Sequence, residues 1–243
     1  RFAQNDRAFS IDVVDQAIFH LIKQQWTSPA LDLFMAVMSN SEIWKPFLIL
    51  IALYALIFRG FKGRAFVLSI AVALLISENL FVGPIKTLVN RKRPKQAQSV
   101  RMVELQKARP EFLTVFKRPK IRYSDESDRT KSGPSFPSGH MTNNAVIATL
   151  CTLFFRRWGW LYWIVAAIVG YSRIYLGAHW PSDVVATLFM ALGEALLIVA
   201  LLEMLWKWAG RRFLPAIYAQ HPRLVGSHFR GDVGRADHSS LPS

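Results

Sequence analysis

The chain of 243 residues is 52% hydrophobic, yet it carries a formal net charge of +14. Its charged and apolar residues lie in separate stretches, whereas a soluble basic protein intersperses them. The single cysteine, Cys151, excludes an internal disulfide framework. We therefore expect an all-α fold, an integral membrane helical bundle.

The first segment, residues 1–28, is predicted to contain an amphipathic helix that lies at the membrane interface. Over Phe9 to Trp26 the apolar residues recur at helical spacing and form one stripe. The stripe consists of Ile11, Val14, Ile18, Leu21 and Ile22. Because the chain begins at Arg1 and not at a methionine, we expect further residues upstream, among which a first span could lie.

Five later segments are apolar enough to cross a bilayer, which takes roughly 20 residues of helix. They are Trp44–Phe58, Ala65–Ile85, Met141–Phe155, Trp158–Leu176 and Asp183–Trp208. The second segment contains Glu78 and the fifth contains Glu194. Charged residues inside a span usually face the bundle interior. For these two glutamates a functional and a structural role both stay open.

The short basic connections between the spans predict the orientation. They contain Arg59, Lys62 and Arg64, then Arg156 and Arg157, and finally Lys207, Arg211 and Arg212. The order of the spans puts all three connections on one face, and the positive-inside rule makes that face cytoplasmic. The long stretch between the second and third spans then lies outside the cytoplasm.

Residues 29–208 thus form a single transmembrane domain. Residues 95–133 form an extracytoplasmic insert within it, and we hypothesise that this basic insert selects the lipid headgroup. The tail, residues 209–243, is polar, with Gly, Pro, Ser and His scattered through it. Such a composition predicts a flexible segment, here on the cytoplasmic side.

Three polar clusters, KTLVNRKRP, PSGH and SRIYLGAHWPSD, fall at the extracytoplasmic ends of the spans. Phosphoryl transfer requires cations around a tetrahedral oxyanion, and Lys86, Arg93 and Arg173 could supply them. Ser138 and Gly139 stand where a helix begins, and the free backbone N–H groups there favour an anion. These five residues are the candidate phosphate-binding residues.

Two histidines could then carry the bond-making and proton-transfer steps. Asp183 follows His179 by four residues, and a carboxylate bonded to one ring nitrogen makes the other a better nucleophile. His179 is therefore the expected nucleophile, and His140, which has no acid nearby in the sequence, is the expected general acid. No cluster of carboxylates or cysteines suggests metal ligands, so neither a metal nor another cofactor is expected.

The motifs K-x6-RP, PSGH and SR-x5-H-x3-D, in this order, resemble the signature of the type 2 phosphatidic acid phosphatase (PAP2) family. The matching residues are Lys86, Arg93, Pro94, Pro137, Ser138, Gly139, His140, Ser172, Arg173, His179 and Asp183. The resemblance implies a phosphohistidine on His179, with Asp183 as its partner and His140 as the acid. Membrane members usually have six spans, and compact members lack the insert. The adjacent Arg91, Lys92 and Lys95 lie outside the motif and are expected to meet lipid headgroups.

We therefore expect a lipid phosphate or pyrophosphate phosphatase of the inner membrane, with its site on the periplasmic face. The resemblance implies an amphiphilic substrate such as phosphatidylglycerol phosphate, phosphatidic acid, undecaprenyl pyrophosphate or lipid A phosphate. A lipid phosphotransferase would use the same site, and a vanadate-dependent haloperoxidase-like enzyme is the alternative from another class. A nucleic-acid partner is not expected between two spans, and the oligomeric state stays open.

Overall fold

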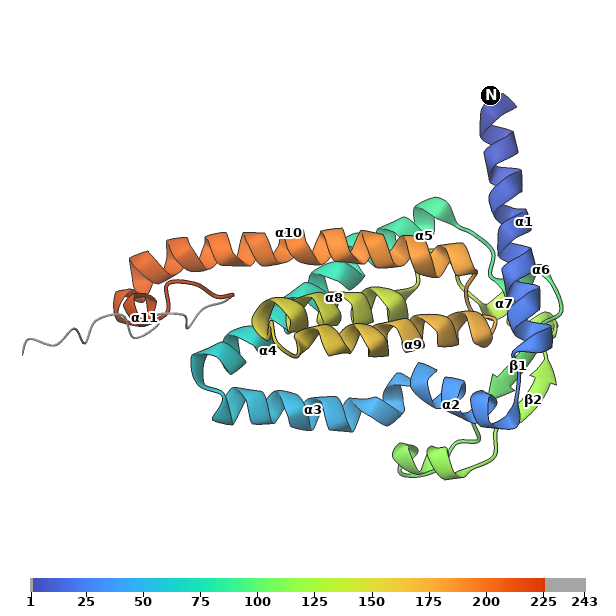
Figure 1. The fold of residues 1–243 in the computed structure, drawn as a ribbon, viewed down its shortest axis with the longest axis horizontal. Coiled ribbons are helices and arrows are strands. Elements are labelled where there is room, and N and C mark those ends of the chain that lie inside the picture. The colour runs from blue at the N-terminus through green and yellow to red at the C-terminus, as the bar shows by residue number, and fades with distance from the viewer. Residues whose placement is uncertain (1, 226–243) are drawn as a thin grey trace, which may run out of the picture.

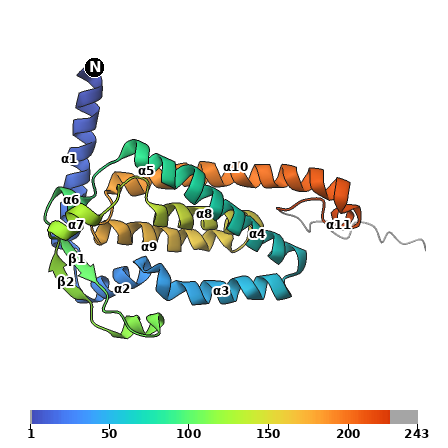
Figure 2. The same cartoon turned by 180° about the vertical axis from the view of Figure 1, so that it is seen from behind.

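The computed structural model describes residues 2–225, and the side chains of these residues except 2–11 and 131. Its body is a bundle of long helices that lie side by side: α3 (Ser41–Phe58), α4 (Gly60–Ile76), α8 (Gly139–Phe154), α9 (Tyr162–Tyr175) and α10 (Pro181–Phe213). Figures 1 and 2 show α3, α8, α9 and α10 lying nearly along one axis, with α4 crossing them obliquely. The expected helical bundle is confirmed, although the chain is mostly helical and not all-α.

Helix α8 lies at the centre of the bundle, in contact with α4, α9 and α10. Its residues Ala145, Val146 and Leu150 are completely buried, and Phe154 is nearly so. Small side chains along α8 let the neighbouring helices approach closely, which is how helices commonly pack in membranes. The core of the protein is therefore built around the helix that follows the PSGH motif.

Three helical stretches of the described residues are long and apolar enough to cross a membrane: Ser41–Phe58, Gly60–Ala97 and Pro181–Phe213. Helices α8 and α9, with 16 and 14 residues, are shorter, although they lie alongside these stretches inside the bundle. The protein is thus an integral membrane protein, and the count of five spans stays a prediction.

The second expected span is not a continuous α-helix. Helix α4 is followed by the π-helical segment η1 (Ser77–Val82) and then by α5 (Gly83–Val89). The N–H of Gly83 bonds to the carbonyl oxygen of Glu78, five residues back. Pro84 has no N–H to donate and crowds the preceding turn, which explains why the helix widens here.

Helix α1 (Phe2–Gln25) crosses the end of the bundle, and Ser28 caps the following helix, α2 (Pro29–Ser39). Helix α1 packs against α9 and α10 through Phe19 and Ile22, and Asp15 is buried beside them. Of the stripe expected from the sequence, Val14, Ile18 and Leu21 remain exposed and Ile22 is buried. Placement of α1 at the membrane interface therefore stays a prediction.

The insert folds over the same end of the bundle as α1 (Figure 1). It comprises α6 (Pro94–Ala97), β1 (Arg101–Glu104), η2 (Glu111–Phe116), β2 (Lys120–Tyr123) and α7 (Glu126–Lys131). Strands β1 and β2 pair antiparallel, with Arg101 opposite Tyr123 and Glu104 opposite Lys120. This two-stranded sheet was not expected from the sequence.

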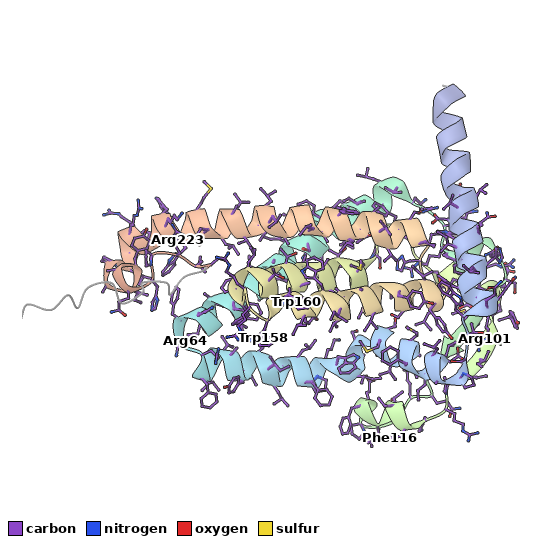
Figure 3. The ribbon with its side chains drawn as sticks, in the orientation of Figure 1. Arg64, Arg101, Phe116, Trp158, Trp160 and Arg223 are labelled. Atoms are coloured by element: carbon purple, nitrogen blue, oxygen red, sulfur yellow. The ribbon has the colours of Figure 1, made fainter. Side chains whose placement is uncertain are left out.

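The three basic connections lie at the opposite end of the bundle. Figure 3 shows Arg64, Trp158, Trp160 and Arg223 there, far from Arg101 and Phe116. The expectation that the basic connections share one end is confirmed. The short 3-10 turn η3 (Gly159–Leu161) leads into α9 at this end.

The sequence predicted a flexible tail from residue 209, but residues beyond this point are helical. Helix α10 continues to Phe213, and α11 (Pro215–Gln220) folds back onto it. The indole N–H of Trp206 donates to the carbonyl oxygen of His221 at 2.9 Å, which holds the return in place. The rest of the predicted flexible tail, residues 226–243, lies outside the described residues.

Candidate active site

The PSGH motif forms the start of α8, as its residue types predict. Ser138 is the N-cap, and its hydroxyl oxygen accepts the N–H of Met141 at 3.4 Å. Its own N–H donates to Thr187 on α10 at 3.0 Å. Because a side-chain oxygen at the N-cap satisfies one otherwise free donor, the turn is stable in this position. The expectation that a helix begins at Ser138 and Gly139 is confirmed.

Lys86, on α5, reaches the start of α8 from the neighbouring chain segment. A Cβ atom added to Gly139 would lie 3.8 Å from the Nζ atom of Lys86. Arg93 caps α6, and its Nε donates to the carbonyl oxygen of Gly133 at 2.8 Å, just before the PSGH motif. The first and second motifs are thus adjacent in space.

Arg173, near the end of α9, lies in the wall of a cavity of about 570 Å³ together with His140. One guanidinium nitrogen of Arg173 donates to the hydroxyl of Ser39. Its Nε is buried and has no hydrogen-bond partner among the described residues. A buried donor without a partner is costly, and a bound oxyanion in this cavity would satisfy it.

His179 and Asp183 are both buried, but the structure does not join them by the expected hydrogen bond. The Nδ1 atom of His179 lies 2.5 Å from the carbonyl oxygen of Ser135. Asp183 instead accepts the hydroxyl of Ser135 and, at 3.1 Å, the N–H of Trp180. The expected direct pair is therefore corrected to an indirect one, in which Ser135 bridges the two residues. The structural reason is that Asp183 lies in the first turn of α10 and accepts the N–H at its N-cap.

Arg91 was assigned to lipid headgroups from the sequence, and this was wrong. Its Nη1 donates to Asp183 and to the hydroxyl of Ser182, both at 2.8 Å. Its Nη2 donates to Asp15 of α1 at 2.8 Å, and Asp15 also accepts the N–H of Ser182 at 2.8 Å. An arginine can bind two carboxylates at once because its donors form a planar fork. Arg91 thus connects α1, the segment that follows α5, and α10 behind the site.

A second buried group of charges joins the insert to the bundle. Arg101 of β1 donates to both oxygens of Asp32 on α2, at 2.8 and 2.6 Å. The Tyr175 hydroxyl donates to the same carboxylate at 2.7 Å, and Lys23 of α1 donates to the carbonyl oxygen of Arg101 at 2.6 Å. The insert is therefore fastened directly beside the motif that ends in Asp183. Sequence reasoning missed this group because its residues are far apart in the chain.

The electrostatics of the two histidines place both of them near Arg93 and Arg173. Burial and the positive charges of Arg173, Arg93 and Lys86 together lower the pKa of His140 to about 4, and burial is the largest cause. Burial also lowers the pKa of His179 well below its usual value, with Arg93 and Arg173 acting in the same direction. Both imidazoles are therefore neutral at neutral pH. Such shifted values are frequent where catalysis takes place.

Among the described residues, no group of three or more His, Cys, Asp or Glu side chains is arranged to hold a metal ion. Arg93 and Arg173 lie near both imidazoles, and Lys86 lies near the start of α8. Cations and the N-terminus of a helix both favour a bound anion.

The sequence comparison identifies the family. The model of the PAP2 superfamily matches residues 63–207, which is more than half of the chain. The chain belongs to the PAP2 superfamily. The matched range contains all eight candidate site residues.

Several phosphatases are similar to this chain in sequence. A lipid A 4'-phosphatase of Bacteroides thetaiotaomicron is 29% identical over 163 residues, covering 65% of this chain and 64% of that protein. A lipid A 4'-phosphatase of Porphyromonas gingivalis is 33% identical over 37% of each chain. An undecaprenyl-diphosphatase of Sulfolobus acidocaldarius is 43% identical over 21% of this chain and 26% of its own length. The chain thus matches less than two thirds of the length of these relatives.

Two solved structures share the fold. LpxE of Aquifex aeolicus is 23% identical with a TM-score of 0.50, covering 76% of this chain and 94% of that one. A transmembrane PAP2-type phosphatidylglycerolphosphate phosphatase of Bacillus subtilis is 19% identical with a TM-score of 0.53, covering 80% and 87%. At this level of identity the comparison supports the PAP2 fold alone.

Proposed function

We propose that this protein is a lipid phosphatase that hydrolyses a phosphomonoester or diphosphate headgroup through a phosphohistidine, without a metal ion. The observation that carries the proposal is the cavity whose wall contains His140 and the unpartnered Nε of Arg173. The phosphatase names of the relatives in two branches, lipid A phosphatases and undecaprenyl-diphosphatases, support it.

His179 is the nucleophile in this proposal. A carbonyl oxygen can only accept, so the contact of Nδ1 with Ser135 requires the ring proton to be on Nδ1. The lone pair is then on Nε2, which is the nitrogen that attacks phosphorus. The Nε2–P bond forms while the P–O bond to the lipid breaks. Ser135 and Asp183 hold the tautomer and the orientation of the ring.

His140 gives a proton to the leaving oxygen and then removes one from the water that cleaves the Nε2–P bond. Lys86, Arg93 and Arg173 stabilise the charge on the phosphoryl oxygens, and the N–H of Gly139 at the start of α8 adds to this effect. The N–H of Ser138 is bonded to Thr187, so Ser138 acts through its place at the helix N-cap. A well-placed donor of this kind contributes about 2.7–4 kcal/mol to the transition state. Phosphoryl transfer depends mainly on such positioning and charge stabilisation.

The substrate in this proposal is an amphiphile whose phosphate lies at the height of lipid headgroups. The site would face the periplasm, because the basic connections at the opposite end favour the cytoplasm. Lipid A phosphate, undecaprenyl diphosphate, phosphatidylglycerol phosphate and phosphatidic acid are the candidate substrates. The insert, which contributes Val103, Leu105 and Lys107 to the cavity wall, is the candidate for selecting among them.

The test is phosphate release from a panel of these four lipids by purified protein, with and without a chelator, followed by acid-free trapping of the phosphoenzyme. We expect that the chelator does not reduce phosphate release. We also expect the labelled phosphoryl group on the trapped enzyme to be stable to base and lost in acid, as for phosphohistidine. His179→Ala abolishes the label, whereas Lys92→Gln, an exposed neighbour of the motif, does not. Loss of activity in the chelator, or label on a serine, contradicts the mechanism.

A further inference from the structure

The short helix η2 of the insert exposes three large apolar side chains. Phe116 is 84% exposed, Phe112 43% and Leu113 38%. Thr114, on the opposite face, is buried and accepts the N–H of Ala108 at 3.2 Å, so the turn is fixed in this orientation. Figure 3 shows Phe116 directed away from the bundle. Single exposed apolar residues are common, but three together on six residues mark an interaction surface.

The position of η2 indicates which partner this surface meets. The helix packs against α3 and lies on the outer side of α2 and α3, at the active-site end (Figures 1 and 2). Helix α3 is one of the candidate spans, and only 11% of its residues are buried. Its exposed Trp44 and Phe47 are therefore lipid-facing. The apolar face of η2 continues this lipid-facing surface.

The charge around η2 is that of a surface for anionic lipid. The flanking positive residues are Lys107, Arg109, Lys117, Arg118 and Lys120, against a single acid, Glu111. Beside η2 a groove of about 400 Å³ combines an apolar lining with Lys117 and Arg118. Asp32 also lines it, but its charge is compensated by Arg101. Aromatic residues next to lysine and arginine are typical of segments that lie in a membrane interface.

We propose that η2 inserts its apolar face into the leaflet next to the active site, while the flanking cations bind anionic lipid headgroups. Glu111 and Thr114 of the same helix line the cavity that contains His140 and Arg173. The membrane contact thus holds one wall of the substrate cavity at the height of the headgroups. The contact itself is independent of the proposed function, and only its kinetic consequence rests on it.

The direct test places a fluorophore at position 116. Cys151→Ser removes the single native cysteine, and Phe116→Cys then takes a bimane label in nanodiscs that contain phosphatidylglycerol. We expect a lipid-borne nitroxide quencher to act about threefold more strongly there than at Tyr123→Cys, an exposed control on β2. Equal quenching at the two positions overturns the proposal. If, in detergent without lipid, the label at position 116 becomes more protected from quenching as the protein concentration rises, the surface binds a second copy of the chain. This result would also overturn the proposal.

The kinetic test replaces Phe112, Leu113 and Phe116 by serine. We expect KM for a substrate embedded in vesicles to rise about fivefold with kcat unchanged. Both constants for water-soluble p-nitrophenyl phosphate should stay as in the unsubstituted protein. In the matched variant Lys117→Gln with Arg118→Gln, the same rise should occur only in vesicles with phosphatidylglycerol. An unchanged KM in vesicles contradicts the kinetic consequence. If the unsubstituted protein releases no phosphate, the proposed function fails while the fluorescence test still decides the membrane contact.

Discussion

Arg91 Nη1 lies 2.8 Å from Asp183 Oδ1, and Nη2 of the same guanidinium lies 2.8 Å from Asp15 Oδ2. Both carboxylates are buried, so each depends on this arginine for charge compensation. Asp183 in turn accepts the hydroxyl of Ser135, whose carbonyl oxygen receives the ring N–H of His179. Helix α1 is therefore connected to the candidate nucleophile through a continuous series of polar contacts.

We expect Arg91→Gln to lower kcat by about 10–100-fold, because a buried carboxylate without its partner rearranges or takes up a proton. Lipid phosphate release by purified protein measures the effect. KM should change little, since Arg91 does not line the cavity. Asp15→Asn keeps an acceptor for Ser182 but loses the charge, and should have a smaller effect in the same direction. Full kcat in Arg91→Gln would show that the series of contacts has no role in positioning His179.

The two contacts of Ser135, one through its hydroxyl and one through its carbonyl oxygen, can be tested separately. Ser135→Ala removes the hydroxyl that Asp183 accepts but keeps the carbonyl oxygen that holds His179. We expect a loss of kcat of about tenfold in Ser135→Ala and a larger loss, about 100-fold, in Asp183→Asn, which also weakens the Arg91 contact. Equal losses in the two variants would favour a direct contact between Asp183 and His179 during turnover. Circular dichroism of both variants provides the control for folding.

The acid role of His140 makes a prediction about pH. Its pKa of about 4 means that the imidazole is neutral at pH 7. A bound phosphoryl dianion offsets the charges of Arg173, Arg93 and Lys86, so it must raise this pKa before His140 can donate a proton. We expect orthovanadate to raise the pKa of His140 by about 2 units. Proton–carbon NMR of labelled histidine measures it, and the resonance is identified by its loss in His140→Gln.

The same reasoning determines the sign of the rate profile. A general acid acts in its protonated form, so kcat should fall as the pH rises above the pKa of His140 in the occupied site. His140→Gln should lose this descending limb. An unchanged pKa with vanadate bound, or a descending limb that persists in His140→Gln, would assign the proton transfer to another group.

The helical bundle and the residues of the site were both predicted from the sequence, but for different reasons. Long apolar segments specify helices through composition alone, so α3 and α10 were expected within a few residues of their bounds. The motif residues were expected because phosphate chemistry limits the residue types that can serve. The π-helical segment η1 was not expected, although Pro84 near the end of an apolar run is a signal that a helix departs from regular geometry.

The contacts behind the site could not be predicted from local spacing. Asp15 and Ser182 are separated by 167 positions, and Arg101 and Asp32 by 69. Their pairing depends on how α1 and the insert fold over the end of the bundle. The spacing of His179 and Asp183 suggested a direct bond, but four residues that cross from a loop into a helix do not fix the distance between side chains. The signal in the sequence for these contacts was the presence of acids such as Asp15 and Asp32 close to apolar segments, where a charge needs a partner.

Among the side chains that the structure describes, Glu194 is buried as Asp15, Asp32 and Asp183 are, and its role can be tested. It lies within α10, where its carboxylate accepts the hydroxyl of Ser77 in η1, and its second oxygen has no partner among the described side chains. Glu78, one residue after Ser77, is exposed. The contact joins α10 to the π-helical segment that leads to Lys86. We therefore interpret Glu194 as a structural residue and Glu78 as its matched control.

We expect Glu194→Gln to keep both activity and the apparent melting temperature in detergent, because the amide oxygen still accepts from Ser77. Glu194→Leu leaves that hydroxyl buried and unpaired, which should cost about 1–3 kcal/mol and lower the melting temperature. Glu78→Gln should change neither quantity. If Glu194→Gln instead abolished turnover at an unchanged melting temperature, a proton-carrying role would replace the structural one, because only the ionisable group would then have been lost.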